Sequence, residues 1–243
     1  MSSALGESTW PDLPSRPLVL VPVGSTEQHG PHLPTSTDTL VATAVAQGLA
    51  RVLARADCRV LVAPPLAYGS SGEHQGFAGT VSIGADALYV VLVEMVRSLA
   101  SWAGRVVFVN GHGGNVDPLS RAVAQLRRES HDVAWVPCTV GAGDLHAGFT
   151  ETCLVMHLAG HLVRPERAVV GNVTPLAELM PALTTVGVRA VSASGVLGDP
   201  TGATAVEGER LMGAMVAEAA WRLSIGAPDG RGCLVVPSAR AQS

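Results

Sequence analysis

The sequence feature that most constrains the fold is the alternation of short apolar runs with longer segments of helical periodicity. The apolar runs have the length of β-strands and span residues 17–23, 59–63, 105–109 and 133–140. Segments with apolar residues at helical spacing span residues 38–56, 85–103, 117–129 and 204–224. Such alternation is typical of a mostly parallel sheet flanked by helices. The sequence therefore predicts an α/β fold.

The length of the chain suits one domain. Its 243 residues, 47% of them hydrophobic and 15% charged, are enough for a single large core. We find no internal repeat and no low-complexity linker, so we expect one domain over residues 1–243. Within it, residues 187–204 are rich in Gly and Ser and are expected to form a long loop. The tail from about residue 227 is expected to be loosely structured.

The charge and cysteine patterns exclude several classes of protein. Sixteen basic residues against twenty acidic ones leave a net charge of −4, which offers no broad basic surface for nucleic acid. All the basic residues are Arg, so a Schiff-base lysine is excluded. No Cys-x-x-Cys pair, signal peptide or membrane-spanning segment stands out. We therefore expect a soluble, cytoplasmic protein with reduced thiols and no membrane partner.

A polar loop follows each of the four predicted strands. These loops span residues 25–30, 70–74, 110–115 and 144–151. In an open parallel sheet, ligands bind outside the carboxyl ends of the strands. The four loops therefore predict one functional site at this edge of the sheet.

The first and third loops carry residues of the types that bind metal ions. Glu27 and His29 are two residues apart, so their side chains share a face in extended backbone. Asp38 begins the next helix, and His112 stands between glycines. Carboxylate and imidazole ligands without a thiolate suit Zn²⁺, Fe²⁺ or Mn²⁺ and favour a hydrolytic centre over a structural one. Taken alone, Glu27 and His29 would equally suit a hydrogen-bonded turn.

The fourth loop adds Asp144, His146 and Glu151. Glu151 lies five residues after His146, in the first turns of a predicted helix. One of the two could bind metal while the other transfers protons. The alternative for Glu151 is an acid that the dipole favours at a helix N-terminus.

Two further patterns do not complete a site. His157 and His161 have the spacing of a zinc pair on a helix, but Leu158 stands where the metalloprotease motif has Glu. The two serines that shortly precede His74 lack the Gly-x-Ser-x-Gly elbow of a serine hydrolase.

These loops together resemble the creatininase family. The matching segments are residues 23–34 with Asp38, 69–80, 110–115 and 146–152. The resemblance implies a three-layer α/β/α fold, a binuclear metal centre and a ring-shaped homo-oligomer, a hexamer or larger. By motif position, the metal ligands are Glu27, His29, Asp38, which bridges, and His112, while His146 is catalytic and Ser71 lies near the substrate-contacting serine. The substrate would pass Ser71, Glu73, His74 and Asp144.

One departure from creatininase itself concerns the residues after His112. Creatininase has Tyr and a ligand Glu there, whereas this chain has Gly113 and Gly114. This argues against creatinine as the substrate and leaves a gap in coordination that Glu151 is placed to fill. The Gly-Gly version also occurs in pyrimidine-formamide hydrolases and in the mycofactocin-system peptidases. The opening LGESTWPDL and the length most resemble the latter branch.

The resemblance implies an enzyme that hydrolyses amide bonds with two divalent cations, Zn or Fe, with Mn also accepted. The peptidase branch removes a modified C-terminal Val-Tyr dipeptide from a ribosomally made precursor peptide. His146 would protonate the leaving amine. Two alternatives stay open: a small-molecule amidohydrolase acting on a cyclic amide or formamide, and a non-catalytic metal-binding oligomer that scaffolds partners.

Overall fold

The structure is a computed structural model that describes residues 4–56, 58–139, 144 and 146–236. Its centre is a four-stranded sheet with the strand order β2-β1-β3-β4. The strands are β1 (Leu18–Val23), β2 (Val60–Val62), β3 (Arg105–Asn110) and β4 (Val133–Pro137). Every neighbouring pair in this sheet is parallel, which confirms the predicted type of sheet.

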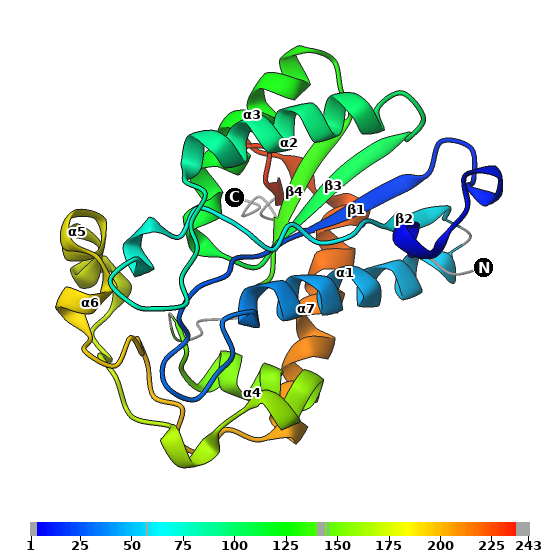
Figure 1. Cartoon of the computed structure of the whole chain (residues 1–243). Coiled ribbons are helices and arrows are strands. Elements are labelled where there is room, and N and C mark those ends of the chain that lie inside the picture. The colour runs from blue at the N-terminus through cyan, green and yellow to red at the C-terminus, as the bar shows by residue number, and fades with distance from the viewer. Residues whose placement is uncertain (1–3, 57, 140–143, 145, 237–243) are drawn as a thin grey trace, which may run out of the picture.

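Helices cover both faces of the sheet (Figure 1). On one face pack α1 (Thr37–Ala54), α4 (Phe149–Ala159) and α7 (Ala205–Ile225). On the other pack α2 (Ala85–Leu99) and α3 (Val116–Arg128). The fold is therefore a three-layer α/β/α arrangement, as the sequence and the resemblance predicted.

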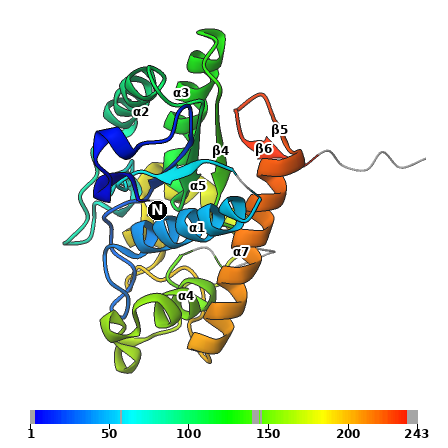
Figure 2. The ribbon, with the colours of Figure 1, turned by 90° about the vertical axis from the view of Figure 1, so that its right-hand side faces the viewer.

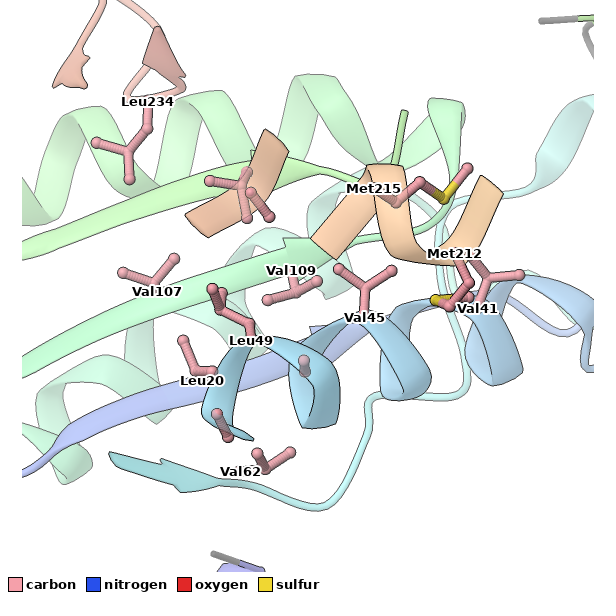
Figure 3. Packing of buried hydrophobic residues seen from close by; sticks show 14 of the residues in the cluster. Leu20, Val41, Val45, Leu49, Val62, Val107, Val109, Met212, Met215 and Leu234 are labelled. Atoms are coloured by element: carbon pink, nitrogen blue, oxygen red, sulfur yellow. The ribbon is translucent and has the colours of Figure 1, made fainter. Parts of the chain in front are cut away.

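The two faces of the sheet bury alternate residues of each strand. In β1, Val19 and Val21 contact the α2–α3 layer, and Leu20 contacts the α1–α7 layer. Figure 3 shows the packing between the sheet and the α1–α7 layer from close by, with Val45 and Leu49 of α1 against the sheet. Fully burying an aliphatic side chain of this size stabilises the fold by about 1.5–3 kcal/mol. These two cores hold the strands, and hence the loops at their carboxyl ends, in fixed positions.

The segment that the sequence predicted as a long loop after residue 187 is partly helical. A short helix, α6 (Val188–Val191), follows α5 (Leu176–Val186) directly, with Gly187 between them at φ +78°. That backbone conformation favours glycine and turns the chain sharply between the two helices. Short 3-10 helices are η1 (Leu5–Glu7), η2 (Trp10–Asp12), η3 (Gly72–His74), η4 (Gly113–Asn115), η5 (Gly160–Leu162) and η6 (Pro165–Arg167).

The C-terminal segment is more ordered than the sequence suggested. Residues from about 227 were expected to be loosely structured, but β5 (Ala227–Pro228) and β6 (Leu234–Val235) form an antiparallel pair. Figure 2 shows this pair at the C-terminal end of α7. Leu234 is fully buried in the core beside α7 and the sheet, which holds the segment in place. The rest of the tail, from residue 237, lies outside the described residues.

Two expectations from composition concern helices and thiols. Over the described part of the chain, no helix combines the length and the apolar character needed to cross a membrane. The four cysteines carry free thiols, and two of them, Cys153 and Cys233, are buried.

Candidate metal centre

The loops after the strands bring a cluster of imidazoles and carboxylates to one edge of the sheet. Glu27 and His29 follow β1, His74 lies in η3 beyond β2, and His112 follows β3. Asp38 comes from the first turn of α1. His146 precedes α4, and Glu151 lies in its first turn. All of the predicted ligands lie in this cluster, whose side chains are buried apart from the partly exposed Glu151.

Three of the predicted ligands form one group around His112. Its Nδ1 atom lies 3.3 Å from Glu27 Oε2 and 3.3 Å from Asp38 Oδ2. One ligand atom from each of these residues lies within 4.8 Å of the others. This spacing suits one cation held by two carboxylates and one imidazole.

A second group lies around His29. Its Nε2 atom is 3.1 Å from Asp38 Oδ1 and 3.7 Å from Glu151 Oε2. His146 completes this group, with its ring centroid 4.2 Å from that of His29. Asp38 therefore presents one oxygen to His29 and the other to His112, which is the arrangement expected of a carboxylate that bridges two cations.

Backbone carbonyls hold three of these imidazoles in one orientation. His29 Nδ1 donates to the carbonyl of Glu27 (3.2 Å), and His146 Nε2 donates to the carbonyl of Gln28 (2.8 Å). His112 Nε2 donates to the carbonyl of Ser70 (3.2 Å). Because a carbonyl only accepts, the outer nitrogen of each ring carries a proton, and the inner nitrogen faces the cluster, where it can bind a cation once it carries no proton. Outer hydrogen bonds of this kind orient metal-binding histidines.

His74 has the opposite orientation. The Gln28 amide is fixed because its oxygen accepts from Gly30 N (2.9 Å) and its nitrogen donates to Gly195 O (3.1 Å). The same nitrogen lies 2.9 Å from His74 Nδ1 and 3.0 Å from His146 Nε2. Because His146 Nε2 already donates to the Gln28 carbonyl and cannot also accept, the second N–H of the amide is donated to His74. The His74 proton is then on Nε2, which lies 3.3 Å from Glu27 Oε1. His74 thus turns an N–H toward the cluster, 3.3 Å from Glu27 Oε1 but without the geometry of a hydrogen bond to it. Its position would also allow it to bind a cation.

Two buried carboxylate oxygens in the cluster have no hydrogen-bond partner among the described residues. They are Glu27 Oε1 and Asp38 Oδ2. Buried polar atoms almost always have a partner, and an ion is one way to supply it. The donor set therefore fits bound cations.

The charges in the cluster shift the pKa values of its members. Burial by itself would lower the pKa of His112, but Glu27 and Asp38 outweigh burial and raise it well above its ordinary value. Burial likewise opposes ionisation of Asp38, yet His29 and His112 hold its pKa far below the usual range. For His146, burial and the nearby His29 and His74 lower the pKa well below its ordinary value. His146 is therefore neutral near pH 7, with Nδ1 able to accept a proton or bind a cation.

The position of Gly114 leaves no room for the side chain that creatininase has there. A Cβ atom at Gly114 would lie 2.2 Å from the carbonyl oxygen of Ser70 and 2.8 Å from Glu73 Oε1. Glu73 Oε1 also lies 3.4 Å from His112 Nε2, on the side away from the other carboxylates. Glu73 therefore lies beside the outer nitrogen of His112, and Glu151 is the carboxylate that lies beside His29 in addition to Asp38.

Two of the residues expected to contact substrate, Ser71 and Asp144, have side chains whose surroundings the structure describes. Ser71 is fully buried, and its hydroxyl has no hydrogen-bond partner in the part of the chain that the structure describes. Asp144 Oδ1 accepts from the backbone N–H of Thr150 (3.1 Å) at the start of α4. A Cβ at Gly148 would lie 1.6 Å from Asp144 Oδ2, so this contact requires glycine. Asp144 stabilises the helix start through this contact, and its contact with substrate stays a prediction.

A cavity of about 880 Å³ opens beside the cluster. Glu73, His74, His112 and His146 line it on the side of the cluster. Residues 183–189, from the end of α5 into α6, line it as well, with apolar and threonine side chains and with Arg189. His157 and His161 are exposed and belong to none of the metal-binding groups of the described residues.

Sequence reasoning missed Gln28 and the wall formed by α5 and α6. Gln28 stands between two predicted ligands, which was a signal that its side chain lies in the same place. The wall had no such signal, because its residues are ordinary for a surface helix. Only the tertiary contact of α5 and α6 with η3 brings them to the cavity.

Comparison with known proteins identifies the family of this chain. The model of the creatininase family, described as creatinine amidohydrolase, matches residues 6–223. The chain belongs to the creatininase family. Within this family it is 56% identical to the mycofactocin precursor peptide peptidase of Mycolicibacterium smegmatis over 96% of this chain and 95% of that protein. It is 53% identical to the protein of the same name from Mycobacterium tuberculosis (strain ATCC 25618 / H37Rv), over 95% and 94% of the two chains.

More distant creatininase relatives share the fold. The creatinine amidohydrolase of Pseudomonas putida is 33% identical over 51% of either chain. A crystal structure of a creatinine amidohydrolase has a TM-score of 0.75 at 28% identity and covers 91% of this chain and 96% of that chain. A creatininase variant described as Zn-Zn type has a TM-score of 0.76 at 26% identity, over 92% and 97% of the two chains. The predicted family is thus confirmed.

Proposed function

We propose that this chain is a metal-dependent peptidase that hydrolyses an amide bond of the mycofactocin precursor peptide and releases its modified C-terminal Val-Tyr dipeptide. The observation that carries the proposal is the 56% identity to a peptidase of that name across 96% of this chain. The buried cluster and the cavity beside it supply a site suited to such a reaction. A cavity of about 880 Å³ has room for several residues of a peptide chain.

The metal-binding residues in this proposal are Glu27, His29, Asp38, His112 and Glu151, with Asp38 shared between two cations. Divalent cations held there, Zn or Fe and also Mn, would polarise an amide carbonyl and activate water. The surrounding carbonyls and Glu73 keep the histidine rings aimed at the cluster, so little reorganisation is needed on binding.

In this proposal the other two histidines of the cluster, His146 and His74, transfer or donate protons. Neutral His146 presents Nδ1 toward the cluster, 3.7 Å from Glu27 Oε1, where it can take a proton and pass it to the leaving amine. His74 presents Nε2–H from the neighbouring side of the same carboxylate and can donate to an oxygen that develops negative charge. The burial of these groups excludes water and strengthens both interactions.

We also propose a quaternary structure and a cellular location for the protein. We expect one domain that works as a ring-shaped homo-oligomer, a hexamer or larger, in the cytoplasm. The measurement for the oligomer is the mass in solution by light scattering.

The decisive experiment is hydrolysis of the modified precursor peptide by the purified, metal-loaded protein, followed by mass spectrometry. We expect release of the modified dipeptide, loss of activity on chelation, and recovery on adding Zn²⁺ or Fe²⁺. Creatinine and a pyrimidine formamide serve as rival substrates in the same assay. Turnover of a rival without peptide cleavage would make the chain a small-molecule amidohydrolase. Inactivity on all three substrates with both metals bound would favour the scaffold alternative.

A further inference from the structure

One wall of the cavity is formed by the α5–α6 segment, which lies beside η3 (Figure 1). The side chains of this segment that line the cavity include the apolar Leu183 and Val186, and the last of them is Arg189. This wall faces the same space as His112 and His146. A peptide that reaches the metal centre through this cavity therefore passes the α5–α6 wall.

The charge along the cavity is uneven. Glu73 and Asp117 line it with carboxylates, and the metal-binding carboxylates lie behind them. Arg189 is the one arginine among the lining residues of this cavity. Since the chain contains no Lys, no other side chain with a permanent positive charge lines it. Away from the metal centre, the favourable place for a negatively charged part of a substrate is therefore beside Arg189.

The guanidinium of Arg189 is held in position but is not neutralised. Its Nη1 donates to the carbonyl of Gly76 (2.9 Å), and its Cζ lies 5.3 Å from the centre of the Phe77 ring. Across the described residues, no carboxylate lies within ion-pair distance of it. A guanidinium has five N–H donors, so most of them remain available to a ligand. A side chain already held in place also loses less conformational entropy when it binds one.

We propose that Arg189 binds a carboxylate of the peptide substrate and thereby positions the peptide in the cavity. The planar guanidinium can donate two parallel hydrogen bonds to a carboxylate, which fixes orientation as well as charge. The carboxylate is an acidic side chain near the cleaved bond or the chain terminus. This inference rests on the proposed peptidase function.

The test compares the wild-type protein with Arg189→Gln on three forms of the precursor peptide. The first is the modified peptide itself, the second has Asn or Gln for the acidic residues near the cleaved bond, and the third has an amidated C-terminus. Arg189→Gln is expected to raise KM for the first peptide by about 10- to 100-fold with kcat nearly unchanged. Arg189→Lys should lose less, because it keeps the charge without the planar fork. Arg210→Gln, on α7 and outside the cavity lining, is the matched control.

The wild-type protein should lose the same factor when the relevant carboxylate of the peptide is replaced, and Arg189→Gln should not respond to that replacement. The peptide form that shows this coupling identifies the source of the carboxylate. Equal kcat/KM of both proteins on the first peptide would overturn the inference, as would an Arg189→Gln variant that remains sensitive to both replacements. If the wild-type protein cleaves none of the peptides, the proposed function itself is wrong. Metal content measured on each preparation shows that the centre is intact.

Discussion

At the scale of single residues, the orientation of ring nitrogens decides which histidines can bind metal. His29, His112 and His146 each donate their outer N–H to a backbone carbonyl and turn the inner nitrogen, which can bind a cation when it carries no proton, toward the carboxylates. His74 accepts at its outer nitrogen from Gln28 and turns a proton toward them. The hydrogen-bond partners of these buried histidines thus decide which ring nitrogen carries the proton, and therefore which rings can bind a cation.

Asp38→Ala is expected to lose both cations. The two carboxylate oxygens of Asp38 face different histidines, His29 and His112, so its removal takes a ligand from each group. Elemental analysis of the purified variant measures the loss, and circular dichroism checks that it is folded. Asp86→Ala, an exposed aspartate on α2, is the control and should keep both. Close to wild-type metal content in Asp38→Ala would disprove the bridging role.

Glu151→Gln is expected to lose one cation and retain the other. Glu151 lies beside His29 and accepts from the backbone N–H of Ala147 (2.6 Å). It belongs to the metal-binding group of His29 and not to the group of Glu27, Asp38 and His112. The measurement is metal content per chain, with the exposed Glu166→Gln as the control. A solved structure with both cations present and the Glu151 carboxylate more than about 4 Å from either would contradict the assignment, since Zn–carboxylate distances are about 2.0–2.2 Å.

His146→Ala is expected to keep both cations and to lose activity by about 10²- to 10⁴-fold, the usual contribution of a general acid or base. Metal content and turnover are measured on the same preparation. His161→Ala, an exposed histidine after α4, is the control and should remain active. Loss of a cation would instead identify His146 as a ligand. Near-full activity would leave His74, whose Nε2–H also faces Glu27, as the proton donor.

At the scale of elements, loops at the carboxyl ends of the strands supply most of the site, and the C-terminal hairpin stabilises the layer behind it. Leu234 of β6 packs in the same core as α1 and α7. The backbone of Cys233 forms an isolated parallel β-bridge with Trp135 of β4, which attaches the hairpin to the sheet. The hairpin is short, so we attribute its order to this burial and not to its own two strands.

Leu234→Ala is expected to lower the free energy of unfolding by about 2–5 kcal/mol, because it removes a fully buried side chain and leaves a cavity. Val235→Ala, at the neighbouring and more exposed position, should cost less than about 1 kcal/mol. Denaturant titration of both variants provides the comparison. Equal stability of the two would mean that the hairpin does not contribute to the core in solution.

At the scale of the whole molecule, metal binding is coupled to protons and to folding. Burial alone would lower the pKa of His29, but Asp38 and Glu151 raise it to about 10. Burial raises the pKa of Glu151 to about 7, against the charge of His29. In both cases the folded, metal-free protein binds protons more tightly than the unfolded chain does. Its stability should therefore fall as the pH rises, from about 4.5 to 7 through Glu151 and from 6.5 to about 10 through His29.

Cations replace these protons, so the metal-loaded protein should not show this loss. We expect the difference in Tm between loaded and chelator-treated protein to widen between pH 6.5 and 9. With free metal a thousandfold above Kd, the difference should be about 10 °C. Addition of Zn²⁺ to weakly buffered metal-free protein at pH 7 should also release about one or two protons per chain. Parallel Tm curves and no proton release would show that the histidines are neutral before metal binds.

The sequence by itself determined the α/β class, the order of the elements and the loops that carry the site, because apolar periodicity and strand-ending motifs are local properties. It also predicted that Glu27, His29, Asp38 and His112 meet, since parallel strands end at a common edge. The tertiary structure alone decided the tautomers of His74 and His146, the position of Arg189 in the cavity, and the burial of Leu234. Each of these depends on contacts between residues far apart in the chain, and no local pattern records which carbonyl, loop or core a side chain will meet.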